Sequence, residues 1–221
     1  MNRASLSPDW DDYLFVLRED AHQLLAWGYA DVRAELPTTR DEYDITGLIA
    51  DAMARRTDDP ATPDRFSLYS VRPEHPVSSA RTRGKDRPRL DIQIEKCGRP
   101  KCYFTFEAKR MRDDGGATIS DSLRHYLGPE GVGRFVTGRY AAESIEAAML
   151  GYVQAHDPAF WLERVGSAFA DDAASELKAL RMLSGFQRTQ IIPDLSHEAV
   201  SRHARDCLPH LMLFHVFLDC Q

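Results

Sequence analysis

Hydrophobic residues recur with a helical period in two segments near the start of the chain. Between Pro8 and Val32 the apolar positions lie three or four residues apart, which predicts one long amphipathic helix, with Gly28 as the position where it is most easily broken. In residues 38–56 the apolar positions follow one helical face: Ile45, Leu48, Ile49, Ala52 and Met53. The chain is therefore expected to open with two amphipathic helices.

A second pattern, with a period of two, extends over residues 90–111. Alternation of this kind predicts two strands, joined by a turn that contains Gly98 and Pro100. One face of this hairpin is apolar: Leu90, Ile92, Ile94, Phe104, Phe106 and Ala108. The other is polar and is expected to be open to solvent: Asp91, Gln93, Glu95, Tyr103, Thr105, Glu107 and Lys109. The register that turns both apolar faces toward one core centres on Arg99 and pairs Asp91 with Glu107.

The remaining patterns predict further strands and helices. Short strands are expected at 66–71 and 147–155, and the apolar run at 208–218 is expected to close the chain as a buried strand. Helices are expected near 118–127, on the way to Tyr140, from 157 onward and at 174–183, with a polar connection after the last. These elements predict an α/β fold: a small mixed central sheet flanked by helices, with extra N- and C-terminal helices.

Composition is typical of one soluble domain. The chain has 221 residues, 43% hydrophobic and 28% charged, and this length is short for two full domains. We expect a cytoplasmic protein with no membrane association, because its start does not resemble a secretory signal and its apolar runs are too short to span a bilayer. The four cysteines are too sparse for a disulfide scaffold, and a metal site at Cys97 and Cys102 with histidines is the weaker interpretation.

Charge is unevenly distributed along the chain. The net charge of -6 argues against a freestanding nucleic-acid binder, because phosphate contacts rest on Lys and Arg. Residues 81–112, however, carry 11 basic residues against four acids, so that this segment has +7 and the remainder -13. Such a segment is either a binding surface for a phosphate backbone or a solvated loop. The candidate phosphate contacts in it are Arg81, Arg83, Lys85, Arg87, Arg110 and Arg112.

The paired carboxylates of the hairpin are the main candidates for chemistry. Two adjacent carboxylates suit a hard divalent cation such as Mg²⁺, which takes oxygen ligands, and a nearby ammonium can orient a water or neutralise developing charge. The alternative is a polar outer face on which Lys109 only offsets Asp91 and Glu107. Lysine usage favours the first interpretation, because only five of the 28 basic residues are lysines. Arginine supplies neither the compact point charge nor the accessible neutral form of a lysine.

These residues resemble the motif of the PD-(D/E)XK restriction-endonuclease-like nucleases. The match is Asp91, fifteen intervening residues, and then Glu107-Ala108-Lys109, with Leu90 where the family often has proline. The resemblance extends to the order helix, strand, hairpin, helix, strand over about residues 38–155, which would be the core of a single domain over 1–221, with 156–221 as an elaboration. It implies that Asp91, Glu107 and the Ala108 carbonyl ligate Mg²⁺, or Mn²⁺ in its place, and that Lys109 serves the attacking water.

The family often adds a carboxylate from the preceding helix, and Glu42 is the candidate for that catalytic role, with Asp41 as the reserve. Both lie near the apolar face of the predicted helix. The competing interpretation is a capping box, in which Thr39 caps the helix and Glu42, at its third position, bonds back to the cap. The two interpretations stay open at this point.

The resemblance implies a metal-dependent endonuclease, most simply one that acts on DNA, with a partner protein or a second copy of the chain supplying further DNA contacts. The alternatives are a catalytically inactive binding or assembly subunit and a nuclease directed at RNA. Residues 128–153 and the closing "HVFLD" loosely resemble uncharacterised bacterial restriction-like proteins, some encoded near anti-phage defence genes. Arg134 and Arg139, in that region, either reach phosphates or are solvated helix-surface residues.

Overall fold

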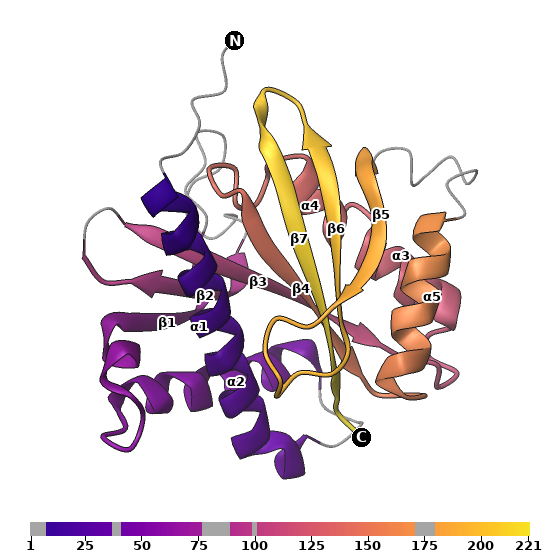
Figure 1. Cartoon of the computed structure of the whole chain (residues 1–221). Helices are drawn as coiled ribbons and strands as arrows, with labels where there is room; N and C mark the ends of the chain where they lie inside the picture. The colour runs from indigo at the N-terminus through magenta and orange to yellow at the C-terminus, as the bar shows by residue number, and fades with distance from the viewer. Residues whose placement is uncertain (1–7, 37–40, 77–88, 99–100, 171–179) are drawn as a thin grey trace.

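A seven-stranded mixed β-sheet forms the centre of the computed structural model, which describes residues 8–36, 41–76, 89–98, 101–170 and 180–221 (Figure 1). The strands, in their order across the sheet, are β1 (Tyr69–Pro76), β2 (Arg89–Lys96), β3 (Cys102–Met111), β4 (Glu146–Val153), β7 (Leu208–Asp219), β6 (Glu198–Arg205) and β5 (Met182–Thr189). β4 is parallel to both of its neighbours, β3 and β7, and the other pairs are antiparallel. The predicted α/β class with a mixed sheet is confirmed.

Helices cover both faces of this sheet (Figure 1). α1 (Pro8–Val32) and α2 (Glu42–Asp58) pack against each other and against the strands β1 to β3, and the short 3-10 helices η1 (Arg33–Glu35) and η2 (Asp64–Leu68) follow them in the chain. α3 (Ile119–Leu127), α4 (Val132–Val136) and α5 (Pro158–Ala170) lie on the other face. The sheet is therefore the middle of three layers, with one hydrophobic cluster on each side of it.

The two N-terminal helices form as predicted, and α1 continues through Gly28 without a break. A Cβ atom at Gly28 would lie 2.5 Å from Cγ of Met53 and 3.0 Å from the carbonyl oxygen of Ile49. The glycine therefore allows α2 to approach α1 closely. On the facing side of α2, Ile45, Ile49 and Met53 are fully buried, as the helical spacing indicated.

The hairpin has the predicted register. β2 and β3 pair Ile92 with Phe106 and Ile94 with Phe104, and these four side chains are buried in the cluster beneath α1 and α2. Leu90 differs from the prediction, because it belongs to the cluster on the opposite face. Continuing the register by one residue places Asp91 opposite Glu107.

The prediction that the polar face of the hairpin is open to solvent is wrong. Gln93, Glu95, Thr105 and Glu107 are all buried. The charged partners explain this burial, because Arg72 and Lys101 form ion pairs with Glu95 and Arg134 forms one with Glu107. Glu95 and Glu107 therefore contact charged side chains of the protein instead of water.

The last third of the chain departs furthest from the sequence-based expectation. Met182 begins a strand, not the end of a helix; most of the rest of that predicted helix lies outside the described residues. The polar connection expected after it contains most of β5 and all of β6, and of these last three strands only β7 was predicted. Among the described helices, none is long and apolar enough to cross a membrane.

Candidate functional site

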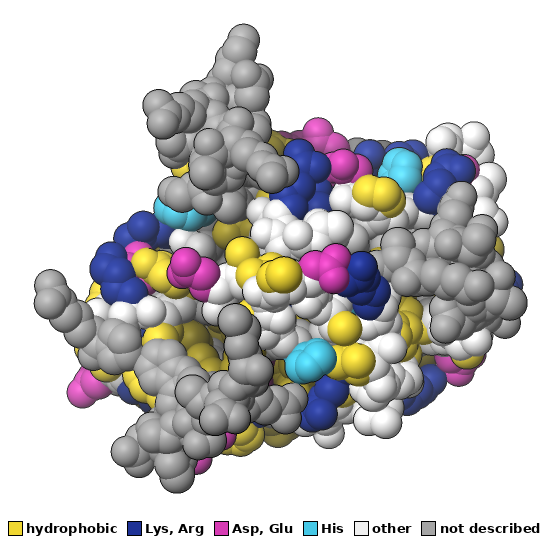
Figure 2. Space-filling model, turned by 90° about the horizontal axis from the view of Figure 1, so that it is seen from above, with side chains coloured by type: hydrophobic (Ala, Val, Ile, Leu, Met, Phe, Trp, Pro, Cys, Tyr) yellow, Lys and Arg dark blue, Asp and Glu magenta, His cyan; other side chains and the backbone are white. Residues whose placement is uncertain are grey.

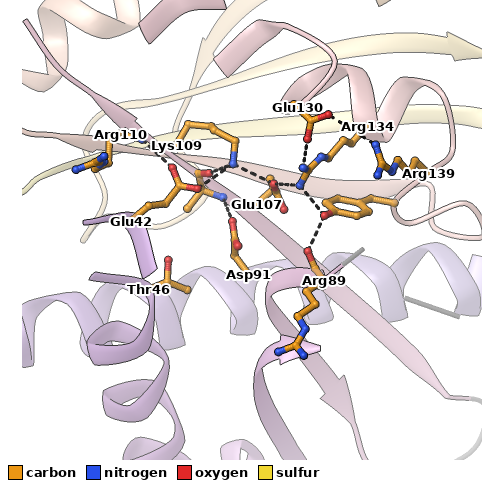
Figure 3. A network of polar contacts seen from close by, with 12 residues as sticks. Glu42, Thr46, Arg89, Asp91, Glu107, Lys109, Arg110, Glu130, Arg134 and Arg139 are labelled. Carbon is orange, nitrogen blue, oxygen red and sulfur yellow. Dashed lines mark hydrogen bonds and ion pairs between the residues drawn. The ribbon is translucent and has the colours of Figure 1, made fainter. Parts of the chain in front are cut away.

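The start of α2 and the strands β2 and β3 bring the predicted motif residues together at one place (Figure 3). Asp91 comes from β2, Glu107, Ala108 and Lys109 from β3, and Glu42 from the first turn of α2. The parallel neighbour β4 continues the sheet behind β3, pairing Glu107 with Met149 and Lys109 with Gly151. The motif therefore stands on strands inside the sheet and not on a loop.

The ammonium of Lys109 lies at the centre of the site. Nζ is 3.0 Å from Oε1 of Glu42, 3.1 Å from Oε1 of Glu107 and 2.5 Å from the carbonyl oxygen of Ala108. Burial alone lowers the pKa of Lys109, but the carboxylates of Glu107, Glu42 and Asp91 outweigh burial and raise it. This direction favours the ammonium form of Lys109 over the accessible neutral form considered from the sequence.

The two hairpin carboxylates are held in a water-poor setting. Oδ2 of Asp91 accepts a hydrogen bond of 2.6 Å from the backbone N–H of Ala108. Burial raises the pKa of Asp91 to about 6, against the lowering effect of Lys109. Glu107 is 0% exposed, and burial, with the charge of Asp91, raises its pKa to about 8 in spite of Lys109 and Arg134. The site thus holds two carboxyl groups whose ionised forms are costly without compensation.

Glu42 joins the helix to the hairpin. Its Oε1 accepts from Lys109, and its Oε2 accepts from the backbone N–H of Arg110 at 3.2 Å. The helix is capped by Asp41, whose Oδ1 accepts from the backbone N–H of Asp44 at 2.9 Å. Glu42 is therefore the first residue of α2 and not the third, as a capping box requires, and Thr39 lies outside the described residues.

Arg134 is part of the site, contrary to its interpretation as a solvated helix-surface residue. Its Nη1 donates to Oε1 of Glu107 at 2.8 Å and to the hydroxyl of Tyr140 at 2.6 Å, and its Nη2 contacts Glu130. The Tyr140 hydroxyl in turn donates to the carbonyl of Arg89 at the start of β2, at 2.6 Å. Nothing in the sequence pattern distinguishes Arg134 from Arg139, which is half exposed and contacts only Glu130 among the described ion pairs.

A cleft of about 360 Å³ opens beside the carboxylates on the α2 side. Its lining is mainly acidic: Asp41, Glu42, Tyr43, Glu74, Asp91 and Arg110. Figure 3 shows the guanidinium of Arg110 pointing away from Lys109, on the side opposite Arg134. Arg112 follows the last residue of β3 and pairs with Asp114. The cleft therefore presents oxygen donors, with Arg110 as the cation in its described lining.

The residues present fit a hard divalent cation in one specific respect. Oε1 of Glu107 receives hydrogen bonds from both Lys109 and Arg134, whereas the buried Oε2 has no hydrogen-bond partner among the described residues. That free oxygen, Asp91 and the Ala108 carbonyl are the all-oxygen donor set that Mg²⁺ prefers. Within the described ranges, however, no three His, Cys, Asp or Glu side chains lie close enough together to hold a metal ion. A cation here would rest on two carboxylates and a carbonyl.

The basic segment is only partly described. Arg81, Arg83, Lys85 and Arg87 lie outside the described residues. On the face shown in Figure 2, the described Lys and Arg side chains lie in separate groups among acidic, hydrophobic and other side chains. Of the predicted phosphate contacts, the structure therefore places Arg110 at the cleft and Arg112 in an ion pair.

The chain matches no protein-family model. No curated protein and no solved structure matches it either.

Proposed function

We propose that the protein is a Mg²⁺-dependent nuclease that hydrolyses phosphodiester bonds in DNA, with Asp91 and Glu107 as the metal-binding carboxylates. The observation that carries the proposal is the buried Oε2 of Glu107, which has no hydrogen-bond partner among the described residues and belongs to a residue opposite Asp91 in the hairpin register. A buried carboxylate oxygen without a partner costs stability. Glu95, Glu146 and Glu198 also have one such oxygen, and Glu107 differs from them in lying opposite a second carboxylate of the hairpin, Asp91.

The charges around the site support a divalent cation and an anionic substrate. When both are ionised, Asp91 and Glu107 carry two negative charges, and the largely buried cations Lys109 and Arg134 offset them. When bound, Mg²⁺ supplies two further positive charges, polarises a phosphoryl oxygen and lowers the pKa of a water. A phosphodiester under attack by hydroxide carries two negative charges, which a bound Mg²⁺ would offset.

Lys109 has a specific task in this proposal. Because its pKa is raised, it acts as an ammonium and not as a base. Its three N–H groups donate to Glu42, Glu107 and the Ala108 carbonyl, so it can donate to the attacking water or to a phosphoryl oxygen in exchange for one of these contacts. Glu42 accepts from the same ammonium and fixes its direction. Glu42 is therefore proposed to orient Lys109.

The arrangement of elements also supports the proposal. Along the chain, helix α2 and strand β1 precede the hairpin that carries the motif, and helix α3 and strand β4 follow it. This is the order that the family resemblance implies. A restriction-endonuclease-like core is therefore proposed for residues 38–155. DNA as the substrate rests on the basic segment 81–112 and on Arg110 at the cleft.

One observation favours a second candidate, a binding or assembly subunit without turnover. The described cleft is lined by four carboxylates, which repel a phosphate backbone unless a cation is bound. In that case the ion pairs of Glu107 with Lys109 and Arg134 would only stabilise the hairpin. The two candidates differ in whether the carboxylates are needed for an activity.

Cleavage of supercoiled plasmid DNA in the presence of Mg²⁺ tests the proposal, with an RNA of similar length as the second substrate. We expect wild-type chain to nick or linearise the plasmid and Asp91→Asn to lose this activity. Glu95→Gln is the matched control, because Glu95 is another buried carboxylate of the same hairpin that is paired with Arg72 and Lys101. Equal cleavage by the wild type and Asp91→Asn rejects Asp91 as a metal-binding residue. Cleavage of the RNA and not of the plasmid shows that RNA, not DNA, is the substrate.

A further inference from the structure

Arg134 is held in place from three sides. Its guanidinium donates to the Tyr140 hydroxyl and contacts Glu130, and its Cζ lies 4.9 Å from the centre of the Tyr140 ring. Tyr140 is itself fixed by its hydrogen bond to the carbonyl of Arg89. An arginine side chain held in this way has little freedom to follow its partner. The guanidinium is therefore a fixed point against which the Glu107 carboxylate can be oriented.

Both cations of the site contact the same oxygen of Glu107. Lys109 and Arg134 donate to Oε1 at 3.1 and 2.8 Å, and Oε2 is left without a donor among the described residues. Two donors on one oxygen fix the rotation of the carboxylate about its last bond. Consequently Oε2 is the oxygen that remains available.

We propose that Arg134, held by Tyr140, is a positioning residue that orients Glu107 so that Oε2 is free to bind the divalent cation. This inference rests on the proposed function, since it assigns Arg134 a role at the same site. The sequence motif includes neither Arg134 nor Tyr140, and both follow α3 in the chain, beyond the hairpin. Outer contacts of this kind typically change metal affinity by about 10- to 100-fold when they are removed.

A simpler role for Arg134 is charge compensation, and the two roles predict opposite results. If Arg134 only neutralises Glu107, its removal takes a repelling cation from the site, so at a pH at which Glu107 is ionised in both proteins Mg²⁺ binds equally well or more tightly. If Arg134 orients Glu107, its removal releases the carboxylate and weakens Mg²⁺ binding. The sign of the change in affinity therefore separates them.

Calorimetric titration of the whole chain with MgCl₂ measures that sign. We expect about 10-fold weaker binding or more for Arg134→Gln, and a smaller loss for Tyr140→Phe, which keeps the arginine but removes its hydroxyl partner. Arg139→Gln is the matched control, because it removes a cation from the same stretch that pairs with Glu130 but not with Glu107. Unchanged or tighter binding by Arg134→Gln overturns the inference.

A second measurement does not depend on the metal. In a crystal structure of metal-free Arg134→Gln, or of Tyr140→Phe if the first variant does not fold, we expect the Glu107 carboxylate to leave its wild-type orientation. An unchanged carboxylate overturns the inference, whatever the affinity. Failure of the wild type to bind Mg²⁺ rejects the proposed function instead, and the orientation of Glu107 in the metal-free variants still decides whether Arg134 positions it.

Discussion

Two clusters of buried polar side chains lie on the same sheet and differ in charge and in how completely their hydrogen bonds are made. The carboxylate cluster consists of Asp91, Glu107, Lys109 and Arg134. The histidine cluster consists of Tyr126, Ser201, His203 and His215. In the first, Oε2 of Glu107 and Nε of Arg134 are buried without a partner, whereas every side-chain nitrogen and oxygen of the second has one.

The hydrogen bonds of the histidine cluster run in one direction. Nδ1 of His203 faces the carbonyl of Leu180 at 2.7 Å and must therefore donate to it. Its Nε2 then accepts from Ser201, Ser201 accepts from Nε2 of His215, and Nδ1 of His215 accepts from the Tyr126 hydroxyl. Burial lowers the pKa of both histidines, so the whole chain of bonds is neutral and complete.

The comparison teaches what an incomplete cluster indicates. A neutral network with all of its bonds made stabilises the fold, because no polar group in it is left without a partner. A charged cluster that leaves one carboxylate oxygen free gives up stability at that point, and such a loss is expected at functional sites. We therefore expect changes in the carboxylate cluster to affect activity and changes in the histidine cluster to affect stability.

The largest effect is expected from Lys109→Arg, which keeps the charge but not the compact ammonium. Cleavage should fall by about 10²- to 10⁴-fold, because a guanidinium cannot take the position between Glu42, Glu107 and the Ala108 carbonyl. Single-turnover cleavage at saturating Mg²⁺ measures the loss. Lys101→Arg is the control on the same hairpin, where the lysine pairs only with Glu95 among the described ion pairs. A near wild-type rate for Lys109→Arg would show that Lys109 only offsets the charge of its carboxylate partners.

The next effect is a dependence of stability on pH. Folding raises the pKa of Glu107 to about 8, so the folded chain binds this proton more tightly than the unfolded chain. The stability that this protonation contributes is complete below the ordinary pKa of a glutamate and is lost as pH rises toward 8. Glu107→Gln does not lose this stability. Without divalent ions, its free energy of unfolding should be close to that of the wild type at pH 5 and exceed it at pH 8 by about 3 kcal/mol.

Urea unfolding of both proteins across this pH range checks the prediction. A difference in stability that does not change with pH contradicts it, because Glu107 would then titrate alike in the folded and unfolded chains. His22, His203 and His215, whose pKa values are lowered, affect both proteins equally and cancel in the comparison.

The smallest effect is expected from Ser201→Ala in the histidine cluster. The change leaves Nε2 of both His203 and His215 without a partner, and it should lower the free energy of unfolding by about 1 to 3 kcal/mol. Mg²⁺ affinity should not change. If Ser201→Ala lost metal binding but kept its stability, the histidine cluster would serve the site and not the fold, contrary to the comparison.

The sequence predicted the carboxylate cluster better than the strands around the histidine cluster. Period-two alternation and the register about Arg99 are local properties, and they placed Asp91 opposite Glu107 correctly. β6 was missed because Ser201, His203 and Arg205, three of its buried positions, are polar, so no hydrophobic alternation marks the strand. Their burial depends on partners elsewhere in the chain, such as His215 for Ser201 and the Ala141 carbonyl for Arg205.

Arg134 shows the same limit within the site. Its partner Glu107 lies 27 residues earlier in the chain, and the hydrogen bonds of Arg134 to Glu107 and of Tyr140 to the start of β2 form only in the folded chain. A pattern of residue types along the chain contains no signal for such a contact. The register that places Asp91 opposite Glu107 was therefore predictable, and the contact of Arg134 with Glu107 was not.

The central claim is that Asp91 and Glu107 bind a divalent cation, and the effect of Mg²⁺ on thermal unfolding tests it most directly. A ligand that binds only the folded chain stabilises it by about 2.7 kcal/mol at 100 times its dissociation constant. We predict that Mg²⁺ raises the unfolding temperature of the wild type and not that of Glu107→Gln, at pH 8 and constant ionic strength. An equal shift in both proteins, or none in the wild type, would contradict the account.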